Sequence, residues 1–219
     1  MSKEIENNKK TLLKEYAEIK SLIKKRIKEF KLAFFKGEDE KLFSELVFCI
    51  FTPQSKAKNC WQTVERLVKK DLLFKGNAKI LASHMNYVRF RNNKANYVVA
   101  ARELFKVNKE NNLRNTILSF DDTFSLRNWL VDNVKGYGYK EASHFLRNIG
   151  YGDKLAILDR HILKNLKLFG VINEIPRTIT KKVYYEIETK MLSFSKELNI
   201  PADHLDLLFW YKEAGEVFK

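Results

Sequence analysis

A lysine and an aspartate, nineteen positions apart, have the residue types needed to break a bond to a sugar carbon. Lys140 follows the Gly-Tyr-Gly motif at 136–138, and Asp159 follows the apolar run at 155–158. A neutral lysine amine is a nucleophile that can form a Schiff base. A carboxylate beside it can receive a proton or stabilise the positive charge that develops on a sugar. The pair, if it meets in one cleft, suits cleavage through a cationic sugar.

Each residue also has a plainer interpretation. A lysine in the first turn of a helix lies at the positive end of the helix dipole, which disfavours its charged form. Lys140 could nevertheless be a solvated or phosphate-binding lysine. Asp159 could serve only as a helix N-cap, which is the commoner role of aspartate at such a position. The residues alone therefore leave both readings open.

Two helices around a short hairpin are expected to position Lys140. The helical period predicts one helix over 122–133, with Asp121 or Asp122 as its N-cap, and a second over 139–149. The second helix is about 16 Å long, and the nine-residue segment that follows it can return over that distance. A third helix is predicted over 159–169. Its first turn can therefore meet the first turn of the second helix, which brings Lys140 and Asp159 into one cleft.

The hairpin itself carries much of the glycine in the chain. Half of the eight glycines lie between positions 136 and 152. Gly136 and Gly138 would let the backbone take positive φ and approach another surface closely. Free N–H groups at the start of the next helix favour a phosphate, and Lys135 adds a cation. The alternative is a plain helical corner whose glycines serve only packing.

The rest of the chain also has a helical period, without convincing alternating strands. An all-α fold of about ten helices is therefore expected. Gly37 is expected to end the first helix, and the helix after it, almost wholly apolar, is expected to be buried. Thr178 or Thr180 is expected near the start of the penultimate helix. The remaining predicted helices span 4–35, 40–51, 55–69, 77–85, 91–106, 179–198 and 202–214.

The charge balance favours a polyanionic partner. The chain has 41 Lys and Arg against 27 Asp and Glu, a net charge of +14. Nucleic acid is the commonest such partner, although a lysine-rich solvated surface is the alternative. Cys49 and Cys60 lack metal-ligand spacing and are expected to be buried free thiols in a reducing compartment. No signal peptide or membrane span is expected, so a cytoplasmic, nucleoid-associated protein without metal or organic cofactor is predicted.

The segment VKGYGYKEASHFLRNIGYGDKLAILDRHIL, 134–163, resembles the helix–hairpin–helix DNA glycosylase superfamily. In that pattern a Gly-apolar-Gly-x-Lys motif precedes an aspartate by nineteen residues, as here. The blocks KEASHFLRN, LDRHIL and VRFRNNKANYVV, with the ending LDLLFWYKEAGEVFK, are most similar to the second class of 8-oxoguanine glycosylase/AP lyase, found chiefly in archaea and some bacteria. The resemblance covers about residues 40–219. Tyr137 departs from it, because a smaller aliphatic residue is usual there.

The resemblance implies an enzyme that excises 8-oxoguanine and cleaves the strand by β-elimination. Lys140 would form the Schiff base at C1′, and Asp159 would be the catalytic carboxylate. Phe90 and Trp210 would stack on the base, and Asp206 and Lys219, with its terminal carboxylate, would read it. The implied DNA-binding residues are Lys135, Gly136, Gly138, His161 and Gln54, the last replacing the extruded base in the duplex. Without the resemblance, the two aromatics could be core and Lys219 a frayed end.

The resemblance also implies an architecture and partners. Two helical subdomains, 1–41 with 153–219 and 42–152, would hold the helix–hairpin–helix at the cleft between them. The partner would be double-stranded DNA containing 8-oxoguanine, bound by a monomer. Two other hypotheses remain: a monofunctional glycosylase for another damaged or mismatched base, and a non-enzymatic helix–hairpin–helix DNA-binding module. Lys140 argues against both, because neither needs a nucleophilic lysine.

Overall fold

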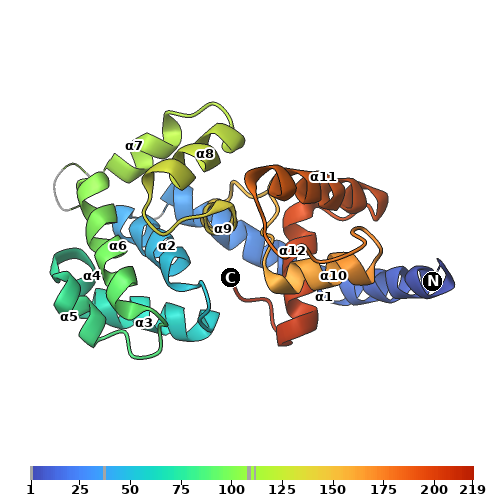
Figure 1. Ribbon diagram of the computed structural model, residues 1–219, viewed down its shortest axis with the longest axis horizontal. Coiled ribbons are helices and arrows are strands. Elements are labelled where there is room, and N and C mark those ends of the chain that lie inside the picture. The colour runs from blue at the N-terminus through green and yellow to red at the C-terminus, as the bar shows by residue number, and fades with distance from the viewer. Residues whose placement is uncertain (1, 37, 108–109, 111) are drawn as a thin grey trace.

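The computed structural model describes residues 2–36, 38–107, 110 and 112–219, and every regular element in those residues is an α-helix (Figure 1). The predicted all-α class is confirmed. Gly37, expected to end the first helix, lies outside the described residues. The helices are α1 Ser2–Lys36, α2 Asp39–Phe51, α3 Ala57–Lys69, α4 Leu72–Lys75, α5 Ala78–Ser83, α6 Arg91–Leu104, α7 Asn112–Leu118, α8 Thr123–Asn133, α9 Tyr139–Asn148, α10 Arg160–Leu168, α11 Lys181–Glu197 and α12 Ala202–Ala214.

Local capping chemistry sets the starts of three helices that matter for the site. Asp122, Asp159 and Thr180 each accept backbone N–H groups of the first turn that follows. The short helix α4 and the helix α7 were not predicted. Each buries only two apolar side chains, so the periodic signal is weak there. None of the helices in the described ranges is long and apolar enough to cross a membrane.

Buried apolar side chains form two clusters. The first extends from Phe34 through α2–α9 to Leu155, and the second combines α1 from Leu12 to Phe30 with residues from Ala156 to Val217. Figure 1 shows the same grouping: α2–α9 lie on one side, α10–α12 lie on the other, and α1 runs across both. On this packing we propose that 42–152 and the combined segments 1–41 and 153–219 are separate subdomains.

A buried ion pair joins the two clusters. Arg127 of α8 donates from both terminal nitrogens to Glu188 of α11, at 2.6 and 2.8 Å. Glu188 also accepts the backbone N–H of Ala156 at 2.8 Å. Four aromatic rings surround the guanidinium at 4.9–5.5 Å, those of Phe124, Tyr139, Tyr184 and Tyr185. Separating the two side chains would leave a buried charge without a partner, which is strongly destabilising. The ion pair therefore fixes α8 and the following hairpin against α11.

Candidate active site

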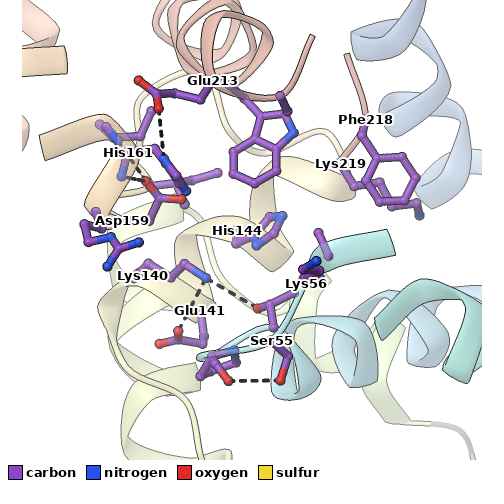
Figure 2. Close-up of a pocket in the computed structure, with 18 of the residues that line it drawn as sticks. Ser55, Lys56, Lys140, Glu141, His144, Asp159, His161, Glu213, Phe218 and Lys219 are labelled. Carbon is purple, nitrogen blue, oxygen red and sulfur yellow. Dashed lines mark hydrogen bonds and ion pairs between the residues drawn. The ribbon is translucent and has the colours of Figure 1, made fainter. Parts of the chain in front are cut away.

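A cavity of about 1280 Å³ lies where segments of the two clusters meet. Its walls come from residues 52–59 before and at the start of α3, from one face of α9, from the segment 157–162, and from α12 with the C-terminal tail. Figure 2 shows Lys140, His144 and Asp159 together in this cavity. Segments remote in sequence therefore converge on one hollow large enough for a nucleoside.

The helix–hairpin–helix predicted from the sequence is present. Helix α8 ends at Asn133, a four-residue turn follows Val134, and α9 begins at Tyr139. Tyr137 anchors the turn, because its buried hydroxyl donates to the Leu46 carbonyl at 2.9 Å. The residue that departs from the usual motif thus ties the hairpin to α2.

The two hairpin glycines have different tasks. Gly136 has φ of 88°, and a Cβ there would lie 2.5 Å from Cδ2 of Tyr97. Only glycine fits that position, but the close neighbour is the protein's own α6. Gly138 is extended, with φ of −109°, so the expected positive φ is wrong at this position. Its N–H donates to Glu141 Oε2 at 3.2 Å, which satisfies a free donor at the start of α9.

Lys140 extends from the first turn of α9 into the cavity. Its Nζ donates to Thr52 Oγ1 at 3.4 Å and lies 3.6 Å from Glu141 Oε1. Both distances are long for a lysine contact, and the side chain is 22% exposed. The amine is therefore loosely held at the edge of open space.

Asp159 lies on the same cavity and caps α10, so the cap is confirmed and the catalytic role stays a prediction. One carboxylate oxygen, Oδ1, accepts the N–H groups of His161 and Ile162, each at 2.8 Å. Among the described residues, the hydrogen bonds to the Asp159 carboxylate use only Oδ1. A carboxylate oriented through one oxygen can present the other to a reacting centre.

The apolar return segment before Asp159 is buried without being a strand. Tyr184 donates from its hydroxyl to the Ala156 carbonyl at 2.6 Å and accepts the Leu158 N–H at 3.4 Å. Together with Glu188, which binds the Ala156 N–H, these side chains replace the backbone partners that a sheet would supply. The position of Asp159 thus depends on α11.

The inner wall of the cavity is polar. Arg147 lies 3.4 Å from Asp206, and both side chains are buried. The pKa of Asp206 is raised to about 6, chiefly by burial. The Arg147 cation opposes this rise, and the carboxylates of Asp159 and Asp203 contribute to it. Trp210 also lines the cavity, and its buried indole N–H has no hydrogen-bond partner among the described residues.

The last residues of the chain cross from α12 to the first cluster. Lys219 forms an ion pair with Glu45 of α2, and its Nζ lies 3.4 Å from the centre of the Trp61 ring. Burial lowers the pKa of Lys219, while Glu45 acts in the opposite direction. The alternative of a frayed end is therefore wrong, because the Lys219 side chain is held by Glu45 beside the cavity that it lines.

The other predicted site residues separate into two groups. Gln54 lines the cavity; it is exposed and has a φ of 57°. His161 also lines the cavity, and its Nδ1 lies 3.4 Å from Glu213 Oε2. Lys135 is exposed on the hairpin. Phe90 is not among the lining residues: its side chain is 56% exposed. It precedes α6 in a left-handed conformation, with φ of 56°, and packs on Arg89, so the structure does not bring it to the cavity.

Many residues that line the cavity were not predicted from the sequence, among them Thr52, His144 and Arg147. Thr52 contacts Lys140, and His144 and Arg147 lie on the same face of α9 as Lys140. Spacings of four and seven from Lys140 would have placed the latter two on one helical face. Thr52 carries no such signal, since it belongs to a loop 88 positions away.

Comparisons with known proteins agree with this geometry. The sequence profile of the family described as 8-oxoguanine DNA glycosylase (Ogg-HhH) matches residues 23–200. A relative from Fusobacterium nucleatum named 8-oxoguanine DNA glycosylase/AP lyase is 48% identical, over 93% of this chain and 94% of that protein.

Two solved structures are also similar. The 8-oxoguanine DNA glycosylase of Thermotoga maritima superposes with a TM-score of 0.87 at 34% identity, covering 98% of this chain and all of that one. The Methanocaldococcus jannaschii 8-oxoguanine glycosylase/lyase, in complex with a 15mer DNA containing 8-oxoguanine, gives a TM-score of 0.84 at 36% identity, covering 95% of this chain and all of that one.

Proposed function

The chain belongs to the 8-oxoguanine DNA glycosylase family, and from this premise we propose that it excises 8-oxoguanine from duplex DNA and then cleaves the damaged strand. The observation that carries the proposal is the presence of Lys140 and Asp159 on one cavity, large enough for a nucleoside, at the helix–hairpin–helix. The relative in complex with DNA containing 8-oxoguanine supports the same substrate.

The reaction begins at C1′ of the damaged nucleoside. Lys140, in its neutral form, attacks this carbon, and the bond to the base breaks with its electron pair leaving on the base. Asp159 stabilises the positive charge that builds up on the sugar and takes up the proton released by the amine. Opening of the sugar ring leaves a Schiff base between Nζ and C1′. Loss of a C2′ proton then expels the 3′ phosphate by β-elimination, and water releases the enzyme.

The surroundings of Lys140 favour this use of its amine. Its two polar contacts, with Thr52 and Glu141, are long and leave open space toward the cavity. Asp159 is fixed by two backbone N–H groups, so it needs no rearrangement to face a developing charge. A monofunctional glycosylase or a DNA-binding module would not need a lysine amine that is loosely held and open to the cavity.

DNA binding is assigned to the basic surface, the hairpin and the cavity rim. Lys135 and the N–H groups of the first turn of α9 would contact a phosphate, which positions the duplex without reading its sequence. An extruded base is needed for chemistry at C1′, because that carbon is inaccessible in stacked DNA. Gln54, exposed at the rim, would fill the space that the base leaves.

Borohydride trapping tests the proposal. The wild-type protein is mixed with a duplex carrying 8-oxoguanine opposite cytosine, borohydride is added, and a denaturing gel is used to detect a covalent protein–DNA adduct. We expect an adduct with this duplex and with an abasic duplex, and none with undamaged DNA. A protein that releases the base without an adduct would be monofunctional, and one that only binds would be a DNA-binding module.

A further inference from the structure

His144 lines the cavity with both ring nitrogens unpaired. The side chain is only 6% exposed, yet neither Nδ1 nor Nε2 has a hydrogen-bond partner in the described parts of the chain. Buried polar side chains in folded proteins almost always have a partner. An unpaired imidazole on the wall of a binding cavity therefore indicates that a ligand supplies its partner.

The place of His144 on α9 indicates which part of the ligand it meets. It follows Lys140 by four residues, so the two side chains lie on one face of the helix, about one turn or 5–6 Å apart. His144 is the more deeply buried of the two. If Lys140 bonds to C1′, the base that hangs from C1′ projects past the amine into the cavity. His144 lies at the depth that the base would reach.

The ring is held in a defined orientation and charge state. It packs edge-to-face with Phe48, with the ring centres 5.5 Å apart. Burial, followed by the cations of Arg147 and Lys140, lowers the pKa of His144 well below its usual value, while the Lys219 backbone acts in the opposite direction. A neutral imidazole offers one N–H donor and one lone-pair acceptor. Although the Lys219 backbone interacts with the ring, neither nitrogen has a hydrogen-bond partner of good geometry in the described parts of the chain, so both can bond a ligand.

Purine bases present complementary groups. 8-Oxoguanine carries ring N–H donors and carbonyl acceptors side by side along its edges, and a neutral imidazole can match one such edge. The neighbouring Arg147 cannot replace it as an acceptor, because a guanidinium only donates. The acidic Asp206 is already engaged by Arg147 at 3.4 Å.

We propose that His144 is a base-binding residue that hydrogen-bonds an edge of the extruded purine and so selects for a damaged base. The proposal rests on the proposed function, because it requires 8-oxoguanine in this cavity. It concerns recognition of the base and leaves the chemistry at C1′ to Lys140 and Asp159.

Two substrates separate recognition of the base from chemistry on the sugar. One duplex carries 8-oxoguanine, and the other carries an abasic site, which lacks any base to contact. His144→Phe keeps an aromatic ring against Phe48 but removes both nitrogens, and His144→Gln restores an amide donor and acceptor. Rates are measured with enzyme in excess over DNA, so that product release does not mask the chemical step.

For His144→Phe we expect excision of 8-oxoguanine to fall by about 10- to 100-fold, the loss that one or two hydrogen bonds to a ligand produce. Cleavage of the abasic duplex should fall by less than about threefold, and His144→Gln should recover most of the lost excision. An equal loss on both substrates would assign His144 to folding or sugar chemistry, and no loss on either would remove it from the site. Wild-type protein that cleaves the abasic duplex but leaves 8-oxoguanine in place would instead contradict the proposed function, and with it the base contact.

Discussion

Two lysines reach the same loop, residues 52–55, from different helices and in different states. Lys94 of α6 is 4% exposed, and its Nζ donates to the carbonyls of Phe51 and Pro53, each at 2.7 Å, and to Ser55 Oγ at 3.4 Å. Lys140 of α9 is 22% exposed and makes one hydrogen bond of 3.4 Å, to Thr52. One amine has three oxygen partners, and the other faces a cavity with one long hydrogen bond, to Thr52, and a 3.6 Å approach to Glu141 Oε1.

The two lysines differ in how firmly they are held because their amines lie beside different groups. Phe51 is the last residue of α2, so its carbonyl lacks an intrahelical partner, and a cation beside it is favourable. Lys94 therefore completes the end of α2 and holds the loop. Its three donors are used by three acceptors, which leaves it no freedom to form a bond to carbon. Lys140 has the freedom that a nucleophile needs, and the loop that Lys94 holds supplies its Thr52 contact.

The largest effect is expected from Lys140→Gln. Without the amine no Schiff base can form, so the borohydride adduct should be absent and strand cleavage should fall by at least about 10³-fold. The free energy of unfolding should stay within about 1 kcal/mol of the wild type, since the lost contacts are long and partly exposed. Denaturant unfolding and adduct formation measure the two quantities on the same preparation.

Lys94→Met is the matched control for that comparison. This variant should still form the adduct but should unfold more easily. If Lys140→Gln destabilised the protein more than Lys94→Met did, or kept its adduct, the contrast between a structural and a reactive lysine would be wrong.

The next effect concerns Asp159, whose two candidate roles are separable. In Asp159→Asn the amide oxygen can still accept the N–H groups of His161 and Ile162, so the cap of α10 should persist. The charge that would stabilise a cationic sugar is lost, and we expect base excision to fall by about 10²-fold. Single-turnover excision and thermal unfolding are the measurements. A variant that excises at the wild-type rate would show that Asp159 is only a helix cap.

The sequence predicted those features that depend on local chemistry. The starts of α8, α10 and α11 follow from single side chains, Asp122, Asp159 and Thr180, that cap their own helices. The pairing of Lys140 with Asp159 followed from helix length and the short return segment. Each of these inferences uses residues close together in the chain, where geometry is constrained by covalent connection.

Features that depend on distant partners were not predicted. Arg127 and Glu188 are 61 positions apart, and neither residue type indicates a buried pair. Lys94 looked like any other surface lysine, because its acceptors are carbonyls of a loop about 40 positions earlier. Tertiary contacts, rather than residue type, decide these two cases. Phe90 differs, because its conformation is local: it was expected in the base pocket, but it has a left-handed backbone in the turn before α6 and its side chain is exposed.

The smallest effect is a pH dependence that tests the structural lysine. Burial lowers the pKa of Lys94 to about 8, and the charges of Lys140 and Arg89 act in the same direction, while Cys60 and Glu141 oppose it. An unfolded lysine titrates near about 10.4. Between these values the unfolded chain binds more protons at Lys94 than the native chain does, so this site makes stability rise with pH. The charge of Lys94 thus costs stability below pH 8, and that cost is relieved as pH rises toward 10.

At pH 7 we expect Lys94→Met to lower the free energy of unfolding by about 1–3 kcal/mol, because buried carbonyls lose their donor. From pH 8 to pH 10 the wild type should gain on the order of 1–2 kcal/mol relative to Lys94→Met. The gain stays modest because hydrogen bonds to the carbonyls favour the charged amine. Denaturant titrations at four pH values measure it, and the difference between the two proteins removes other groups that titrate in this range. If the difference in free energy of unfolding between the wild type and Lys94→Met stayed constant or became smaller from pH 8 to pH 10, Lys94 would titrate as an ordinary surface lysine. Its contrast with Lys140 would then rest on hydrogen bonding alone.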